Sequence, residues 1–232
     1  MFRAYKQVYN KRKQLGGETM CEMNTKTIIT IGREFGSAGK EIGSVLAKRL
    51  QIKLYNEEML ERASQESGMC KNVFETHDEK PKGSFLYSLV MDTYSLSRSA
   101  GTYSDMPLNH KVFLAQFDAI QKIASEGSCI LIGRCADYAL TEYENVLNVF
   151  IYADLKARVK RIQRIYELDE NKAKDLISKT DKKRRSYYNY FTNKNWSDVT
   201  SYDLCLNSAT LGIDGVVSTI ESAIKNRETN SI

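Results

Sequence analysis

The stretch that most constrains the fold covers residues 27–43, with the sequence TIITIGREFGSAGKEIG. A short β-branched run leads into a turn that contains Gly32, Gly36 and Gly39, and Lys40 opens a segment with helical spacing of its apolar residues. Glycines let backbone N–H groups close around an anion at the start of a helix, where the helix dipole favours negative charge. This order of strand, glycine turn, lysine and helix predicts a phosphate-binding loop.

The loop meets only part of the G-x-x-x-x-G-K-[ST] pattern of nucleotide-binding loops. Gly39 and Lys40 match, but Glu34 stands at the first glycine position and Glu41 stands where a hydroxyl would face a metal ion. The dinucleotide-binding pattern G-x-G-x-x-G fits less well, because the first two glycines are too far apart. The simplest alternative is a glycine turn followed by a surface lysine.

Length and composition fit one α/β domain with insertions. The chain has 232 residues, of which 42% are hydrophobic, so it can bury a full core. A net charge of +5 suits anionic small molecules and is too small to indicate nucleic acid. The five cysteines lack metal-ligand spacing and indicate reduced thiols, and no apolar run approaches the roughly 18 residues of a membrane span. We expect a cytoplasmic protein without nucleic-acid or membrane partners; nothing in the sequence indicates an oligomeric state.

Apolar periodicity predicts five short strands separated by helices. The strands are expected at 27–31, 53–55, 128–132, 146–152 and 202–206, and helices at 40–50, 57–67, 72–80, 109–126, 171–191 and 211–225, with another after Asp154 as its N-cap. Because parallel neighbours need helical crossovers, this alternation predicts a doubly wound parallel sheet. Residues 1–24 show no sustained apolar period and are expected to be a flexible leader. Pro81 and Pro107 bracket a Ser- and Tyr-rich region that is expected to be a mobile insertion.

Six segments resemble, in the same order, the cytidylate kinase-like proteins, a branch of the nucleoside monophosphate kinases. They are IGREFGSAGKEIG, LYNEEML, ILIGRCADY, FIYADLKARVKRI, TDKKRRSYYNYFT and YDLCLNS, and the resemblance covers about residues 25–226. It implies a three-layer α/β/α P-loop kinase fold with a five-stranded parallel sheet in the order 2-3-1-4-5. It also implies one domain over 25–232, with a helical monophosphate-binding insertion at about 57–108 and a lid at about 154–195.

The resemblance implies ATP as phosphoryl donor and a nucleoside monophosphate, CMP or dCMP, as acceptor. The residues expected at the donor phosphates are Gly36, Ser37, Ala38, Gly39 and Lys40. Those expected to be catalytic are Lys40, Arg158 and Arg161, and those expected at the acceptor are Arg134, Asp181, Arg184 and Asn56. Such groups suit phosphoryl transfer, which depends mainly on positioning and neutralising two phosphate chains.

Several of these residues have a structural alternative. Arg158 and Arg161 could lie on a solvated helix face, and Asp181 with Arg184 could form an i,i+3 ion pair. The aromatic run at 187–191 could stack on a base, although its density favours packing of the lid against the core.

The resemblance also implies Mg²⁺, but the metal ligands are undefined. Ser37 or Ser44 could replace the missing hydroxyl, and Asp137 could hold a metal-bound water. Cys135 stands where cytidylate kinases proper tend to carry an aspartate. Because of these departures, a catalytically weak nucleotide sensor is one alternative function.

Two further functions stay open. The long insertion would suit a kinase for a different small acceptor. The basic, aromatic segment at 179–194 could bind RNA, with steeply salt-dependent affinity, although the small net charge argues against it.

Overall fold

A computed structural model describes residues 27–69, 71–77 and 107–230; the predicted leader and the centre of the predicted insertion lie outside these residues. One parallel sheet has the strand order β2-β3-β1-β4-β5. Its strands are β1 (Ile28–Arg33), β2 (Lys53–Tyr55), β3 (Cys129–Ile132), β4 (Val146–Tyr152) and β5 (Leu204–Asn207). The predicted α/β fold and strand order are confirmed.

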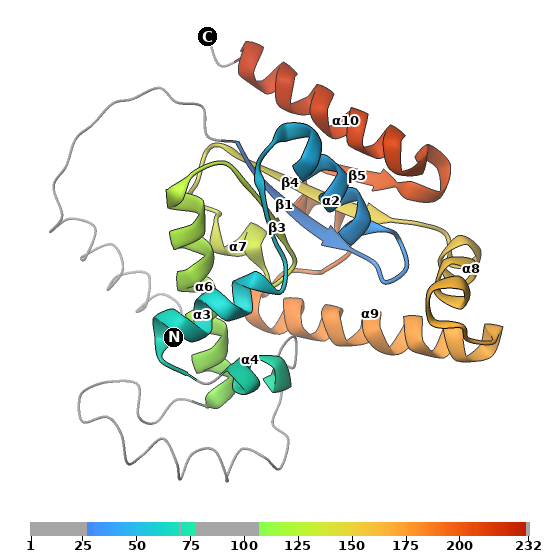
Figure 1. Cartoon of the computed structure of the whole chain (residues 1–232), viewed down its shortest axis with the longest axis horizontal. Coiled ribbons are helices and arrows are strands. Elements are labelled where there is room, and N and C mark those ends of the chain that lie inside the picture. The colour runs from blue at the N-terminus through green and yellow to red at the C-terminus, as the bar shows by residue number, and fades with distance from the viewer. Residues whose placement is uncertain (1–26, 70, 78–106, 231–232) are drawn as a thin grey trace, which may run out of the picture.

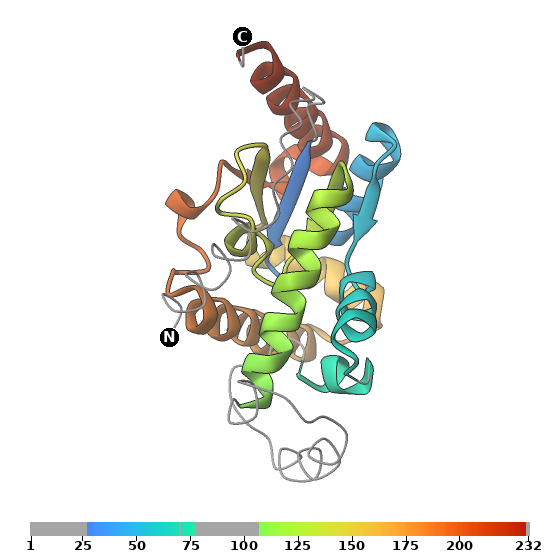
Figure 2. The same cartoon turned by 90° about the vertical axis from the view of Figure 1, so that its left-hand side faces the viewer.

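Helices cover both faces of the sheet, which gives three layers (Figure 1). On one face lie α2 (Gly39–Leu50) and α10 (Ser208–Asn230), and on the other lie α6 (Leu108–Glu126) and the short α7 (Ala136–Ala139). Two helices of the predicted insertion, α3 (Glu58–Ser67) and α4 (Lys71–His77), pack beside α6 (Figure 2). The predicted lid consists of α8 (Leu155–Tyr166) and α9 (Glu170–Thr192), and a 3-10 turn at Val199–Ser201 precedes β5.

Alternate residues of the central strands enter two separate cores. Ile29 and Ile31 of β1 pack with α2 and α10, whereas Ile28 packs with Ile120 and Ile123 of α6. Burial on both sides explains why the strands are continuous β-branched runs, as a central parallel strand requires.

At the carboxyl end of β1 and β4 the second face becomes aromatic. Phe113 of α6 stacks on Phe191 of α9, with ring centroids 4.2 Å apart, and Phe150 of β4, Tyr187, Tyr188 and Trp196 belong to the same cluster. The aromatic run of α9 therefore packs the lid helix against the body, which is the alternative that its density favours.

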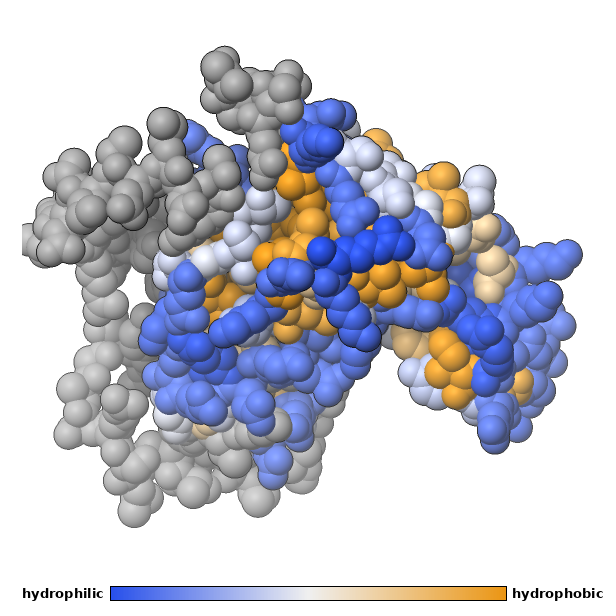
Figure 3. All heavy atoms as spheres, turned by 45° about the horizontal axis from the view of Figure 1, so that its top comes forward, coloured by the Kyte–Doolittle hydropathy of each residue, from blue (hydrophilic) through white to orange (hydrophobic). Residues whose placement is uncertain are grey.

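The lid helices α8 and α9 pair through a small core of their own, formed by Val159, Ile162, Ala173 and Ile177. Figure 3 shows that the lobe carrying these helices projects from the body and is largely hydrophilic on this face. Asp154 caps α8 as predicted, because its Oδ1 accepts the N–H of Ala157 at 2.8 Å. Within the described residues, no helix is long and apolar enough to cross a membrane.

Candidate active site

The loop between β1 and α2 presents the start of a helix at the carboxyl edge of the sheet. Gly36 and Ala38 have left-handed backbone, with φ of 85° and 66°. A Cβ on Gly39 would lie 2.6 Å from Cβ of Arg33, so a larger residue cannot enter without moving backbone or side chain. No side chain caps α2, and the first N–H groups of an α-helix lack intrahelical acceptors. These groups are the candidates for the anion-binding donors that the glycine pattern predicts.

Lys40 lies on the exposed side of this loop and connects to the predicted acceptor residues. Its Nζ is 3.1 Å from Oε1 of Glu57, which also lies 3.4 Å from Nδ2 of Asn56. Oδ1 of Asn56 in turn accepts from Nη1 of Arg134 at 3.2 Å. A chain of polar contacts therefore joins the predicted donor lysine to the predicted acceptor arginine, and Glu57 is a member that the sequence did not indicate.

The exposed ion pair between Lys40 and Glu57 is weak enough for Lys40 to exchange Glu57 for another anion. Both side chains are mostly exposed, and exposed pairs contribute only about 0–1 kcal/mol. A phosphate at the start of α2 would offer the ammonium group a more highly charged partner.

Arg134 is buried because the chain makes an unusual turn after β3. Gly133, Arg134 and Cys135 are all left-handed, with φ of 73°, 53° and 57°. The turn directs the guanidinium back over the strand, where it donates to the carbonyl of Ile132 at 3.3 Å as well as to Asn56. Left-handed non-glycine residues are strained, and such strain occurs often at functional sites.

A hollow lies where β1 and β3 end, against α7 and α9. It is lined by Thr30, Ile31, Gly32, Arg33, Gly133, Arg134, Cys135, Ala136, Asp137, Arg184, Tyr187, Tyr188, Trp196 and Tyr202. Three of the lining residues are arginines, the residue type that binds phosphate in bidentate geometry. Arg33 is a lining residue that the sequence did not indicate.

Asp137 in this hollow is already bound by a neighbouring side chain. The hydroxyl of Tyr188 donates to its Oδ2 at 2.6 Å, and burial raises the pKa of the carboxyl. The role of Asp137 in holding a metal-bound water stays a prediction.

The described residues do not form a magnesium site of their own. The hydroxyl of Ser37 is buried against the carbonyls of Glu34 and Ile151, at 2.9 and 3.0 Å, so it is already used as a donor. Glu41, at the metal-facing position, pairs with Arg161. In the described part of the chain, no group of three or more His, Cys, Asp or Glu side chains is arranged around a common metal position.

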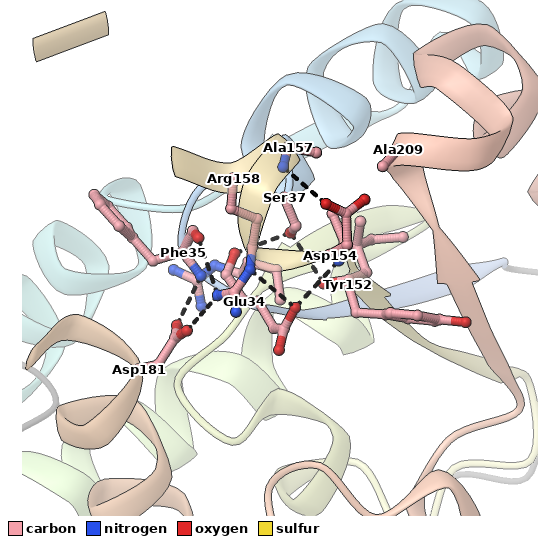
Figure 4. A network of polar contacts seen from close by, with 12 residues as sticks. Glu34, Phe35, Ser37, Tyr152, Asp154, Ala157, Arg158, Asp181 and Ala209 are labelled. Carbon is pink, nitrogen blue, oxygen red and sulfur yellow. Dashed lines mark hydrogen bonds and ion pairs between the residues drawn. The ribbon is translucent and has the colours of Figure 1, made fainter. Parts of the chain in front are cut away.

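The predicted lid arginines both reach the loop. Arg161 pairs with Glu41, the residue after Lys40. Arg158 is little exposed and pairs with Oδ2 of Asp181 at 2.5 Å and with Oε2 of Glu34 at 3.4 Å (Figure 4). Neither arginine lies on a solvated helix face, the alternative that their spacing allowed.

The predicted acceptor residues of α9 also contact the loop. Oδ1 of Asp181 accepts the N–H of Phe35 at 2.7 Å, and Nη1 of Arg184 donates to the carbonyl of Arg33 at 3.2 Å. The structure thus brings the predicted donor, acceptor and lid residues together around one edge of the sheet, with Arg184 also lining the hollow.

The sheet order, the loop after β1 and the helical lid define a P-loop kinase fold. Shikimate kinase from Bacteroides thetaiotaomicron shares this fold, with a TM-score of 0.50 and 12% identity over 86% of this chain and 99% of that one. An uncharacterised protein from Eubacterium ventriosum superposes with a TM-score of 0.63 and 25% identity, again over 86% of this chain and 99% of that one.

The family follows from the sequence. The model of the cytidylate kinase-like family matches residues 28–210, and the chain belongs to this family. Cytidylate kinase from Methanococcus aeolicus is 29% identical over 108 residues, which cover 46% of this chain and 61% of that protein. Cytidylate kinase from Methanocaldococcus jannaschii is 26% identical over 127 residues, which cover 53% of this chain and 71% of that one. The match to the first relative therefore spans about three fifths of its length.

Proposed function

We propose that this protein is a cytoplasmic kinase that transfers the γ-phosphoryl group of ATP to a nucleoside monophosphate, with CMP or dCMP as the acceptor. The observation that carries the proposal is the uncapped start of α2 with Lys40 beside it, joined through Glu57 and Asn56 to the buried Arg134. A donor phosphate site and an acceptor phosphate site then lie at the same edge of the sheet. Family membership supports the nature of the two substrates.

In this mechanism the protein positions phosphates and supplies no covalent intermediate. The N–H groups of residues 36–40 bind the donor phosphates, and Lys40 leaves Glu57 to contact the transferred group. Arg134 and Arg184 bind the acceptor phosphate, and Asn56 orients Arg134. Arg161, which pairs with Glu41 next to Lys40, stabilises the charge of the transition state. In phosphoryl transfer this charge is spread over the equatorial oxygens.

A nucleotide sensor without turnover is the second candidate function. The observation that favours it is that the hydroxyl of Ser37 is turned toward backbone carbonyls and Glu41 occupies the metal-facing position. A coupled assay with ATP, magnesium and a panel of monophosphates separates the two functions. ATP binding without turnover for every acceptor would favour the sensor.

Replacing Lys40 tests the donor site. Lys40→Ala should lower kcat/KM by about 10²-fold or more, the effect of removing one preorganised donor to developing charge, and should remove the thermal stabilisation by ATP. Lys48→Ala, on the same helix and exposed, is the matched control and should behave as the wild type. Unchanged stabilisation by ATP in Lys40→Ala would show that this loop is not the donor site.

A further inference from the structure

Three charged side chains from distant parts of the chain meet behind the phosphate loop. Figure 4 shows Arg158 of α8 between the carboxylates of Glu34 and Asp181. These side chains are 11%, 22% and 12% exposed, respectively, so the contacts are largely shielded from water. Removing one partner of such a set leaves charge buried without compensation, which is costly.

Both carboxylates also accept a backbone N–H. Oε2 of Glu34 accepts from Ala153 at 3.1 Å, just after β4, and Oδ1 of Asp181 accepts from Phe35 at 2.7 Å, inside the loop. Glu34 itself stands at the outer glycine position of the nucleotide-binding pattern. An ion-pair network therefore occupies the place where a glycine normally shapes the loop.

Helix α9 holds the loop backbone at two successive points. Asp181 and Arg184 are one helical turn apart and so face the same side. The first accepts the N–H of Phe35, and the second donates to the carbonyl of Arg33 at 3.2 Å. The guanidinium of Arg184 also lies 5.6 Å from the ring centroid of Phe35. The resemblance assigns Asp181 and Arg184, the D-x-x-R pair, to the acceptor. In this structure the two side chains instead bind the backbone of residues 33–35.

We propose that Glu34 and Asp181 are positioning residues that act through Arg158 and hold the phosphate loop in the shape that binds ATP. This proposal rests on the proposed kinase function for the identity of the donor. It assigns Asp181 to the donor loop, because both of its carboxylate oxygens already bind protein groups. Donor binding then depends on α9, although the sequence places only acceptor residues there.

Isosteric amides test the proposal without leaving cavities. In Asp181→Asn one carboxylate oxygen becomes an NH₂ group, so the side chain cannot accept from both the N–H of Phe35 and Arg158. Glu34 uses Oε2 for both Ala153 and Arg158, so Glu34→Gln can keep this oxygen as an acceptor and instead removes the negative charge that faces Arg158. Each variant should raise KM for ATP about tenfold, which corresponds to about 1.4 kcal/mol, while KM for the monophosphate changes less than twofold. Amide hydrogen exchange over residues 35–38 should accelerate in both. Asp175→Asn on α9 and Glu170→Gln at its start are matched controls, since among the described residues both pair with exposed lysines away from the loop, and both should match the wild type.

A double-mutant cycle tests whether Glu34 acts through Arg158. If it does, the double variant Arg158→Met with Glu34→Gln should raise KM for ATP no more than the larger of the two single variants does. The reason is that the effects of substitutions within one contact network do not add. Additive effects would overturn the shared network. A rise in KM for the monophosphate with KM for ATP unchanged in Asp181→Asn would instead assign this residue to the acceptor.

The two proposals fail in different ways. If the wild type binds ATP without turnover, the kinase proposal fails, and ATP affinity by calorimetry with hydrogen exchange still decides the role of Glu34 and Asp181. If turnover is present but loop exchange and KM for ATP are unchanged in both variants, the positioning proposal alone fails.

Discussion

Two regions of the core, one on each face of the sheet, are built from different kinds of side chain. Under α2 and α10 the core is aliphatic, with Ile31, Leu46 and Ile220 fully buried. Under α9, at the carboxyl end of the sheet, the core is aromatic, and its rings carry hydroxyl groups. The hydroxyl of Tyr187 donates to Gln116 and that of Tyr188 donates to Asp137, so the aromatic region is tied to polar groups, of which Asp137 lines the hollow.

This difference indicates that one region contributes mainly to stability and the other also shapes the candidate site. Aliphatic packing has no directional requirement beyond shape, so the α2 and α10 face contributes mainly stability. Hydroxyl hydrogen bonds fix where α9 sits, and α9 carries Asp181 and Arg184. Damage to the first region should therefore lower stability alone, and damage to the second should change the site as well.

The largest effect is expected on the aliphatic face. Ile220→Ala should lower the free energy of unfolding by about 3 kcal/mol, since it removes a fully buried side chain and leaves a cavity. Urea unfolding measures the loss, with the exposed Ser218→Ala on the same helix as control. KM values should be unchanged under folding conditions. A change in KM for ATP would contradict the division between the two regions.

An intermediate effect, and one that depends on pH, is expected at Asp137. Its pKa is raised by burial above the ordinary 3.8, so the folded protein holds a proton that the unfolded chain releases. This contribution to stability is fully present below pH 3.8 and is lost as the pH rises through the raised pKa. Asp137→Asn keeps the oxygen that accepts from Tyr188 and removes the titration. The stability of the variant relative to the wild type should therefore increase from pH 4 to pH 7, as measured by urea unfolding at each pH. A constant difference would mean that Asp137 does not titrate with folding.

The smallest effects are expected from two hydroxyl groups of α9. The buried Tyr187 donates to Oε1 of Gln116 at 2.9 Å, whereas Tyr190 is 45% exposed and lies 3.3 Å from Nε2 of His110. Tyr187→Phe should cost about 1 kcal/mol, the net value of one hydrogen bond. Tyr190→Phe should cost less than about 0.5 kcal/mol, as at most surface positions. Equal losses of stability would show that burial does not make the hydrogen bond of Tyr187 stronger than that of Tyr190.

Local sequence pattern was enough to predict five parallel strands and most helices, whereas the strand order came from the family resemblance. β-branched runs marked the strands, Asp154 marked the start of α8, and the glycine turn marked the loop. The boundaries moved by one to three residues at most strand and helix ends; β1, for example, extends to Arg33 because it pairs with β4 up to that residue. The four residues of α7 escaped prediction because one turn carries no detectable periodicity.

The partners of the site residues could not be predicted, because they come from far along the chain. Glu34 and Arg158 are 124 positions apart, and Asn56 and Arg134 are 78 apart, so no spacing rule connects either pair. Glu34 was recognised only as a departure from a pattern. Its contacts with Arg158 and Ala153 are visible only once β1 and β4 are adjacent.

The strained turn after β3 links two positions that lie 100 residues apart. A Cβ at Gly133 would fall on the guanidinium of Arg33, and its left-handed backbone independently favours glycine. The side chain of Arg33 also lies over Gly39, so a Cβ added to Gly39 would collide with that side chain. A side chain at either glycine would thus require Arg33 to move. Among relatives, the two glycine positions should tolerate larger residues only where position 33 has become small, so the three positions are expected to vary as a set.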